Sequence, residues 1–589
     1  MNIPERIAAL RALMKTEGLD AYITLNGDPH AGEYVARHYT MRTWLSGFTG
    51  SAGTLVVTTE KAALWTDGRY VVQAAKQLEG SGIEMVLIGG PGKPTMEEWL
   101  KSEIPGGCAG WWGSLISLSV ARKLEEDLKS AGIRLTMTGD LTASIWTDRP
   151  PLPAAPVWEH PLEYTGEAAA QRINRVREAI AEKGANAQLI GRLEDIHWLF
   201  NIRGGDIDGL PVAYAWALVT RDTATLFTEL RRVEKGAASM LKDNGVTLAE
   251  YAEIVPALRA LPGDTVLAFD PKRVNKTLAD SIACPTREQE DVTILMKAVK
   301  NPTEQAGIRE SAVWDGVAMV KFLKWLEEAD RSAETEYTAG VKLAEIRKTM
   351  PLCISTSFGT IAAYKDHGAM MHYSATPETA YTLDGNGMMV LDSGGQYLNG
   401  TTDITRTPVF GTLTRQETID YTMTLKSHIA LADTKFLKGA SPLSLDAIAR
   451  RPLWKLGIEY RCGTGHGVGY CLSVHEEPIN FSQKGRHIPF RPGMLITIEP
   501  GVYREGVSGV RIENEVLVVE DEFNEYGQWY RFEPVTYCPI DLKGVDPSLL
   551  APEELDYLNQ YHQLVYDRLA PRLDEEERAW LAGATRRIG

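Results

Sequence analysis

The sequence predicts an α/β (α+β) protein with two similar α/β domains followed by a larger third domain. Three observations support this prediction. The chain has 589 residues, whereas a single hydrophobic core stops growing at about 250–300 residues. A helix, a glycine and a strand open the chain, and the same order recurs after a proline-rich stretch. A third segment then begins with a long amphipathic helix and contains every strong chemical signal.

The first domain is expected over residues 1–155. Residues 3–17 carry apolar side chains at helical spacing, Gly18 ends this helix, and LDAYITL is typical of a strand. GTLVVTT and AALWTDGRY indicate paired strands, with a helix from about Val71. The stretch TDRPPLPAAPVWEHP at 147–161 contains five prolines, so we expect an extended linker.

The second domain, residues 156–302, is predicted to be a duplicate of the first. Its helix AAAQRINRVREAIAEKGANAQLI repeats the opening pattern, with Gly184 in the position of Gly18. The third domain is expected over residues 303–589 and opens with the helical pattern TEQAGIRESAVWDGVAMVKFLKWLEEA. The glycine-rich GGPGKPT in the first domain lacks the spacing of a phosphate-binding loop, so we interpret it as a turn.

Composition excludes several classes of partner. The net charge of -16 argues against nucleic acid and anionic membranes, because both require a basic face. The N-terminus has charges throughout its apolar stretch, and no window approaches 18 uncharged apolar residues, so we expect a soluble cytoplasmic protein. Six cysteines lie scattered without a CxxC pair, which is typical of free thiols in a reducing compartment.

Four carboxylates in the third segment stand in or beside apolar, strand-like runs. Asp392 and Asp403 lie in LDSGGQYLNGTTDITRT, which we interpret as a strand, a turn and a second strand. Glu499 lies in MLITIEPGVY and Glu513 in GVRIENEVLVV. Buried ionised carboxylates are costly unless they are paired or bind a metal, so one shared metal site would explain all four.

His466, in GTGHGVGYCLSVHEEP, adds an imidazole to this set. Four ionised carboxylates would carry four negative charges, and one divalent ion would leave that charge uncompensated. Two ions bridged by two of the carboxylates balance it. The oxygen-rich donors favour Mn²⁺, with Zn²⁺, Co²⁺ and Fe²⁺ as competitors.

Each residue alone also has a purely structural interpretation. Asp403 could cap a turn, Asp392 and Glu499 could end strands, and Glu513 could lie on the exposed side of an edge strand. The third segment also contains three histidines that could be ordinary loop or core residues: His372, His466 and His475. The joint pattern favours the metal site.

These motifs resemble a known family. The D-x10-D pair and the HGVG, EPG and RIEN stretches are similar, in kind and order, to the five metal ligands of the pita-bread metallopeptidases. That fold is shared by methionine aminopeptidase, prolidase and aminopeptidase P. The length, together with WTDGRY, NIRGGDI and DSGGQYLNGTTDITRT, most resembles the long, three-domain aminopeptidase P. The resemblance implies two creatinase-N-like α/β domains followed by a pita-bread catalytic domain.

The resemblance also implies a role for each donor. Asp392 would hold one metal ion, His466 and Glu499 would hold the other, and Asp403 and Glu513 would bridge the two. A hydroxide between the ions would be the nucleophile, because two cations lower the pKa of bound water.

Four further residues acquire expected roles. His372 and His475 resemble outer histidines that bind substrate and stabilise the tetrahedral intermediate. Arg511 is two residues from Glu513, hence on the same face of a strand, and is predicted to hold Asp392. Tyr503 resembles a tyrosine that contacts the residues around the metal ligands but does not bind the metal itself. We also expect Glu499 to shuttle the proton to the leaving group.

The implied reaction releases the N-terminal residue from peptides with proline in second position, and the implied partners are proline-containing peptides and a second copy of the chain. One departure is Cys462, where many relatives have histidine beside the proline pocket. The alternatives are prolidase, creatinase-like hydrolysis without metal, and a metal-free binding module. Arg69, Arg203 and Asp206, in the first two domains, are interpreted as structural.

Overall fold

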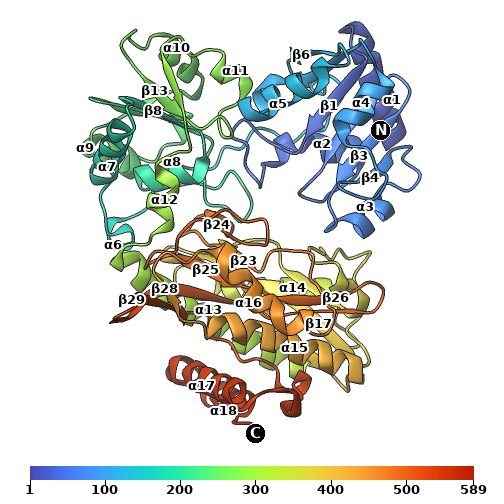
Figure 1. Cartoon of the computed structure of the whole chain (residues 1–589), viewed down its shortest axis with the longest axis vertical. Coiled ribbons are helices and arrows are strands. Elements are labelled where there is room, and N and C mark those ends of the chain that lie inside the picture. The colour runs from blue at the N-terminus through green and yellow to red at the C-terminus, as the bar shows by residue number, and fades with distance from the viewer. The chain divides into compact units, whose positions relative to one another are not determined.

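The computed structural model describes residues 1–589 and divides into two compact units; Figure 1 labels many of their helices and strands. The first unit comprises Met1–His160 and Glu167–Thr293, and the second comprises Pro161–Gly166 and Ile294–Gly589. None of the helices is both long enough and apolar enough to cross a membrane.

The first unit opens with α1 (Ile3–Thr16), which Asn2 caps by accepting a hydrogen bond from the N–H of Glu5 at 2.9 Å. Gly18 follows with φ +66°, the left-handed conformation that glycine adopts without strain. A six-stranded sheet has the order β4-β3-β2-β1-β5-β6. The strands of this sheet and the helices between them are β1 (Ala21–Leu25), α2 (Met41–Ser46), β2 (Thr54–Thr58), β3 (Ala62–Thr66), α3 (Val71–Gln77), β4 (Glu84–Leu87), α4 (Met96–Glu103), β5 (Cys108–Trp112), α5 (Leu118–Lys129) and β6 (Arg134–Thr138).

A second six-stranded sheet in the same unit has the order β12-β11-β10-β8-β13-β14. In the first sheet the pairs β1–β2 and β2–β3 are antiparallel, and the pairs β3–β4, β1–β5 and β5–β6 are parallel. The second sheet has the same pattern: β8–β10 and β10–β11 are antiparallel, and β11–β12, β8–β13 and β13–β14 are parallel. The two modules therefore share one topology. The elements are α7 (Ala169–Glu182), β8 (Ala187–Ile190), α8 (Leu193–Phe200), β10 (Trp216–Thr220), β11 (Ala224–Phe227), α9 (Lys235–Asp243), β12 (Val246–Ala249), α10 (Ile254–Arg259), β13 (Leu267–Phe269), α11 (Lys276–Ala279) and β14 (Thr286–Glu288).

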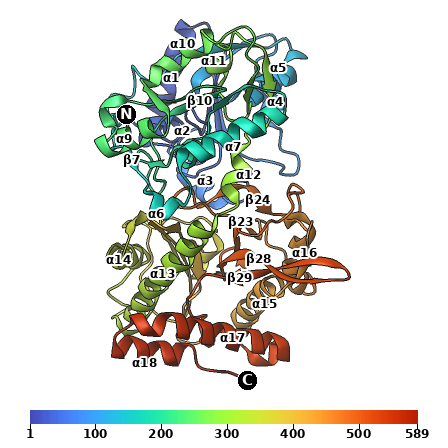
Figure 2. The ribbon, with the colours of Figure 1, turned by 90° about the vertical axis from the view of Figure 1, so that its left-hand side faces the viewer.

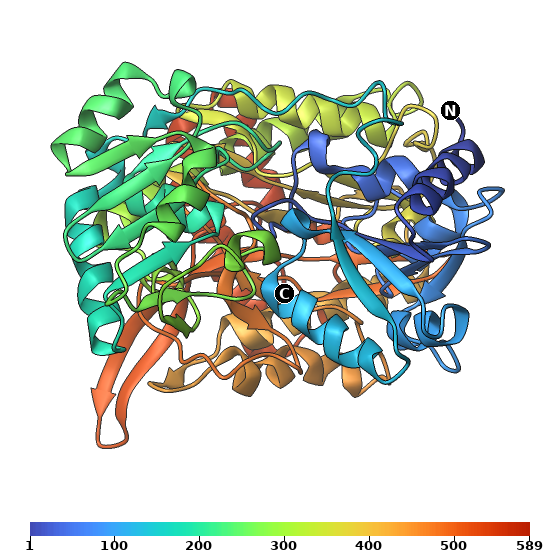
Figure 3. The same ribbon diagram turned by 90° about the horizontal axis from the view of Figure 1, so that it is seen from above.

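The second unit is built around curved antiparallel sheets. One has the order β22-β29-β28-β25-β23-β24, and another pairs β17 with β16, β20 and β21. Figure 3 shows the β28–β29 hairpin extending from the edge of this unit. The strands are β15 (Cys353–Thr356), β16 (Ile361–Tyr364), β17 (Gly387–Ser393), β18 (Gly395–Tyr397), β19 (Gly400–Thr401), β20 (Ile404–Arg406), β21 (Val409–Phe410), β22 (Phe436–Leu437), β23 (Gly465–Gly467), β24 (Glu476–Phe481), β25 (Leu495–Ile498), β26 (Gly501–Arg504), β27 (Ser508–Arg511), β28 (Asn514–Asn524) and β29 (Gly527–Pro534).

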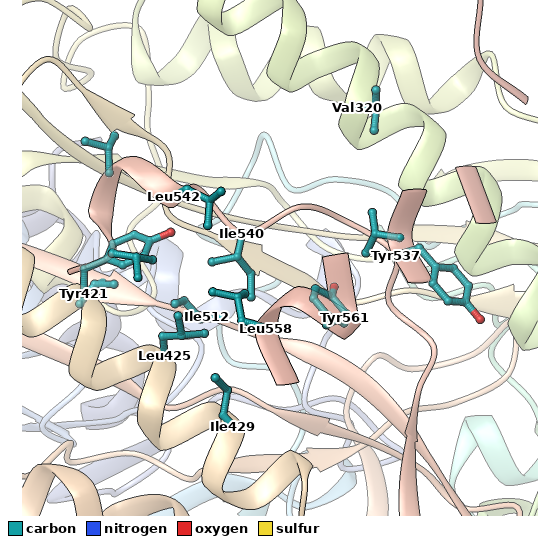
Figure 4. Packing of buried hydrophobic residues seen from close by; sticks show 14 of the residues in the cluster. Val320, Tyr421, Leu425, Ile429, Ile512, Tyr537, Ile540, Leu542, Leu558 and Tyr561 are labelled. Atoms are coloured by element: carbon teal, nitrogen blue, oxygen red, sulfur yellow. The ribbon is translucent and has the colours of Figure 1, made fainter. Parts of the chain in front are cut away.

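Long helices pack against these sheets. Figure 2 shows α17 and α18, in red, below α13 and α15 in the second unit. The largest apolar cluster lies where these helices meet the sheets; Figure 4 shows part of it, including Tyr421, Ile512 and Tyr561. The helices are α12 (Thr293–Ala298), α13 (Pro302–Glu328), α14 (Glu336–Lys348), α15 (Arg415–Ala432), α16 (Pro442–Trp454), α17 (Pro552–Leu569) and α18 (Glu575–Ala584).

The predicted fold class is confirmed, but two local predictions were wrong. The stretch from Asp392 to Arg406 is not a simple hairpin, because β18 and β19 form a separate pair inside it. Asp403 therefore lies between strands. Glu513 also lies outside any strand, since β27 ends at Arg511 and β28 begins at Asn514. The argument that Arg511 and Glu513 share a strand face does not hold, although both side chains reach the same place.

Candidate metal centre

Asp392 and Arg511 form a buried ion pair at the centre of the second unit. Asp392 lies near the end of β17, opposite Thr405 of β20. The Nη2 of Arg511 lies 2.5 Å from Asp392 Oδ2, and both residues are less than 10% exposed. The predicted contact between Arg511 and Asp392 is thus present. It fixes one oxygen of the carboxylate, while Oδ1 has no hydrogen-bond partner.

Thr405 links this pair to Glu513. Its hydroxyl donates to Glu513 Oε2 at 2.7 Å and accepts from Arg511 Nε at 3.2 Å. The N–H of Glu513 donates to the carbonyl of Thr405 at 3.1 Å, which explains how a residue between strands is held in place. The other oxygen of Glu513, Oε1, is buried without a partner.

His466 brings the remaining donors together. Its Nε2 lies 3.5 Å from Asp403 Oδ2 and 3.4 Å from Glu499 Oε1. The donor atoms of Asp403, His466 and Glu513 all lie within 4.8 Å of one another. The N–H of Glu499 donates to the carbonyl of Thr464 at 2.8 Å, so the loop before His466 and the end of β25 are joined.

The tautomer of His466 suits a cation at this point. Nδ1 lies 2.9 Å from the carbonyl of Gly467, so this nitrogen carries a proton. In the neutral ring, the lone pair of Nε2 then faces the carboxylates of Asp403 and Glu499. Three electron-rich groups facing one another repel unless a proton or a metal ion lies between them.

The electrostatics of the carboxylates point the same way. Burial raises the pKa of Asp392 to about 7; Arg511 opposes this shift, and Asp403 and Glu499 add to it. Burial and the same two neighbours raise the pKa of Glu513 well above its ordinary value. Burial disfavours protonation of His466, yet Asp403 and Glu499 raise its pKa to about 9. The carboxylates thus repel one another through a poorly hydrated space.

The donor set therefore fits divalent metal ions. Two buried carboxylate oxygens, Asp392 Oδ1 and Glu513 Oε1, have no hydrogen-bond donor, although native proteins rarely leave such atoms without a partner. Four carboxylates with a single imidazole are hard, oxygen-rich ligands. Metal ions would compensate the charge that otherwise raises these pKa values.

His475 lies beside His466, with ring centroids 4.3 Å apart and the rings nearly perpendicular. The next residue, Glu476, is buried and pairs with Lys297 at 2.9 Å and with Lys300. Lys300 also donates to the carbonyl of Val468 at 2.7 Å. These buried contacts fix the backbone at His475 while leaving its ring partly exposed at the site.

His372 lies in the turn that follows Ala369. The residue before it is tied to the site, because Arg511 Nη2 donates to the carbonyl of Met371 at 3.4 Å. The residue after it is also tied, because the hydroxyl of Tyr373 donates to the buried Glu336 at 3.0 Å. His372 is therefore carried by a loop that is anchored on both sides.

The other predicted residues also lie here. The hydroxyl of Tyr503 accepts from Arg511 Nη1 at 2.8 Å, so Tyr503 supports Arg511. Cys462 is half-buried, and burial together with Glu499 raises the pKa of its thiol to about 12. The thiol is thus neutral at physiological pH and is a poor ligand and nucleophile.

Sequence reasoning missed two residues of this site. Thr405 is the hydroxyl that connects Arg511 with Glu513, and nothing in its sequence context distinguishes it. Glu515 is 1% exposed, its carboxylate accepts a hydrogen bond from the backbone of Asp403, and burial raises its pKa well above the ordinary value. Its position in the apolar strand ENEVLVV could have identified it, by the same argument that singled out Glu513.

Comparisons with known proteins identify the family. The sequence profile of metallopeptidase family M24 matches residues 306–520, and that of the C-terminal region of peptidase M24 matches residues 528–588. Profiles of the creatinase/prolidase N-terminal domain match residues 6–145 and 148–304. Aminopeptidase P1 of Arabidopsis thaliana is 35% identical over 99% of both chains. The chain belongs to metallopeptidase family M24.

Other M24 relatives are similar over the same length. A probable Xaa-Pro aminopeptidase P of Sordaria macrospora is 37% identical over 98% of both chains. The structure of X-prolyl aminopeptidase from Caenorhabditis elegans, a cytosolic enzyme with a di-nuclear active site, superposes with a TM-score of 0.95 at 33% identity and covers both chains fully. The Xaa-Pro dipeptidase of Bacillus anthracis shares the fold over only 64% of this chain, with a TM-score of 0.53 and 22% identity.

Proposed function

We propose that the protein is a metalloaminopeptidase that releases the N-terminal residue from peptides with proline in second position. The observation that carries this proposal is the likeness, over the full length, to aminopeptidase P relatives. Prolidase structures share the fold over only about two thirds of the chain. The cluster of five donors supplies the chemistry that this activity requires.

Two divalent metal ions would be held by five residues. We infer that Asp392 binds one ion, His466 and Glu499 bind the other, and Asp403 and Glu513 bind both. The di-nuclear site of the Caenorhabditis elegans relative supports the number of ions, and the oxygen-rich donors favour Mn²⁺. When bound, such ions polarise a carbonyl group and lower the pKa of water to supply a nucleophile.

The chain's own residues hold and orient the reacting groups. Arg511 and Thr405 each fix one oxygen of a carboxylate, so that the remaining oxygens of Asp392 and Glu513 face the centre. Glu499 is partly exposed beside His466, a position from which its carboxylate can carry a proton to the departing nitrogen. His475 and His372 can donate hydrogen bonds to the substrate carbonyl and to the charge that develops on it.

The bond to proline explains the need for a dedicated enzyme. Its nitrogen carries no hydrogen and the ring fixes φ, so proteases that bind the N–H after the scissile bond fail there. Cys462, beside Glu499 and Arg511, would form part of the wall that receives the ring. A neutral thiol at this position offers an apolar contact rather than a charge.

The test is hydrolysis of three peptides by protein that has been stripped with a chelator and then supplied with Mn²⁺. Cleavage of Arg-Pro-Pro, but not of Arg-Ala-Ala or the dipeptide Ala-Pro, is the expected result. Preference for Ala-Pro would indicate prolidase, and no metal-dependent cleavage would indicate a binding module. Asp392→Asn should abolish the activity, whereas Asp264→Asn, an exposed aspartate of the first unit, should leave it unchanged.

We further propose that the protein acts as a cytosolic homodimer with domains at 1–155, 156–302 and 303–589. The Caenorhabditis elegans relative is a cytosolic enzyme, and the six cysteines here are free thiols, as suits a reducing compartment. Sedimentation velocity should give a species of twice the chain mass. Limited proteolysis should cut first near the two proposed boundaries.

A further inference from the structure

The second unit contains a cavity that none of the predicted site residues lines. Its volume is about 640 Å³, within the range of pockets that bind small molecules. It lies between the C-terminal part of α13, the segment after β20, the loop after Pro539 and helix α18. Its walls are mainly apolar and aromatic, and include Leu323, Leu326, Phe410, Ile540, Leu542 and Trp580. Ile540 and Leu542 belong to the apolar cluster of Figure 4.

Two arginines at the cavity have no carboxylate partner. Arg331 lies over the ring of Phe410, with its guanidinium carbon 4.9 Å from the ring centroid, and donates only a long hydrogen bond of 3.5 Å to the carbonyl of Gly385. Arg586 donates to the carbonyl of Gly583 at 3.0 Å. Both guanidinium groups therefore retain donors for an anion.

A third arginine places a buried positive charge at the cavity. Arg406 is 2% exposed, yet every acceptor of its guanidinium group is neutral. These acceptors are the carbonyls of Pro539, Thr405, Glu513 and Cys538, the side-chain oxygen of Asn514 and the hydroxyl of Tyr561. The hydrogen bonds are satisfied by neutral groups, and the carboxylate of Glu513, which attracts the charge, does not line the cavity.

The acidic residues of the lining are already engaged. Glu327 accepts from Lys543 Nζ at 2.8 Å and from Trp580 Nε1 at 2.7 Å. The carboxylate of Asp541 accepts from the N–H groups of Val409 and Lys543, each at 2.9 Å. Four cationic and two carboxylate side chains line the cavity, so two positive charges remain in excess. The cavity thus combines apolar walls with an excess of positive charge.

We propose that this cavity binds a small organic anion that carries an aromatic or branched apolar group. The apolar part would lie against the walls around Leu326, Ile540 and Trp580. The anionic group would accept hydrogen bonds from Arg331 and Arg586, and the buried charge of Arg406 would add a long-range attraction. This inference does not depend on the proposed peptidase activity.

The test uses two dyes of nearly equal shape, only one of which is charged. Anilinonaphthalenesulfonate is an amphipathic aromatic anion, and N-phenyl-1-naphthylamine is its neutral counterpart. Fluorescence titration of the full chain should show one site that binds the anion at least about tenfold more tightly than the neutral dye, since hydrogen bonds to a charged group are stronger than those to a neutral one. Arg331→Met should remove most of this preference, and the matched control Arg221→Met, at an exposed arginine of the first unit, should not.

A second variant tests the cavity without removing a charge. Ala584 is half-buried and lines the cavity, so Ala584→Phe should obstruct the site for both dyes. Circular dichroism and sedimentation velocity of each variant would verify that fold and assembly are unchanged. Equal affinity for the two dyes, equal effects of Arg331→Met and Arg221→Met, or a cavity closed by a second copy of the chain would each overturn the proposal.

Discussion

Replacement of Arg511 by methionine tests the centre of the site most directly. Methionine keeps the length and the apolar part of the side chain but removes the guanidinium group. Arg511 is 3% exposed and donates to Asp392 Oδ2 at 2.5 Å and to Tyr503 at 2.8 Å. Because Asp392 Oδ1 already lacks a donor, the variant leaves a buried carboxylate with no hydrogen bond on either oxygen.

The expected cost can be estimated from the two contacts. Removal of one partner from a buried ion pair costs about 3–5 kcal/mol, because the other charge remains uncompensated. Tyr503→Phe removes a single hydrogen bond from Arg511 and should cost only about 1 kcal/mol. If Asp392 binds a metal ion, the ion compensates its charge, so Arg511→Met should cost about 2 kcal/mol less with Mn²⁺ than without.

The assay is urea unfolding of the wild type, Arg511→Met and Tyr503→Phe, each in chelator and in saturating Mn²⁺. The informative quantity is the difference in the cost of Arg511→Met between the two conditions. Equal costs would show that the ion does not compensate Asp392. If Arg511→Met in chelator lowers the free energy of unfolding no more than Tyr503→Phe does, the Arg511–Asp392 ion pair contributes no more to stability than a single hydrogen bond.

Three further predictions address single side chains. His475→Gln should lower kcat/KM for Arg-Pro-Pro about a hundredfold and leave the metal content unchanged; loss of metal would instead make His475 a ligand. Cys462→Ser should change neither metal content nor kcat appreciably, because the thiol, with a pKa of about 12, is protonated, and iodoacetamide at pH 8 should label Cys462 slowly. Four buried histidines have pKa values lowered by burial to about 3: His30, His197, His428 and His562. The unfolded chain binds these protons below about pH 6.5, so the free energy of unfolding should fall between about pH 6.5 and pH 3, by up to about 1.4 kcal/mol per pH unit for each histidine. His562→Gln keeps the acceptor that binds the N–H of Ile540 at 3.1 Å and should reduce this slope; an unchanged slope would contradict the assignment.

The fold was predictable where local signals coincide with tertiary needs. The order of helix, glycine and strand at Gly18 recurs at Gly184, and both glycines have positive φ. The same glycine turn after the first helix therefore identified both modules in the sequence. The sheet order was not predictable, because pairing between strands distant in sequence depends on packing that periodicity does not report. The extra pair β18–β19 was missed for the same reason: GGQYLNGT contains turn residues that fit several hairpins.

The candidate metal donors were predictable from the sequence as a group, but the residues that orient them were not. Carboxylates next to apolar runs are visible in sequence because their burial is expensive, and this cost singled out Asp392 and Glu513. Thr405 is an ordinary residue in sequence; only the pairing of β17 with β20 places its hydroxyl between Arg511 and Glu513. Residues that orient other side chains have no distinctive sequence pattern, so the sequence reveals the metal donors but not the residues that hold them in place.

The distribution of hydrogen bonds at this site argues for a function in itself. Arg511 and Thr405 satisfy one oxygen each of Asp392 and Glu513, and the chain supplies no donor to the other oxygen of either carboxylate. A core selected for stability alone would complete these bonds or replace the carboxylates with apolar side chains, which is often the more stable arrangement. The structure instead keeps these two oxygens without donors, in a buried space where the carboxylates of Asp403 and Glu499 add further repulsion. Bound cations, or protons at lower pH, relieve this repulsion, and such a departure from local stability rules is expected where a protein holds a reactive centre.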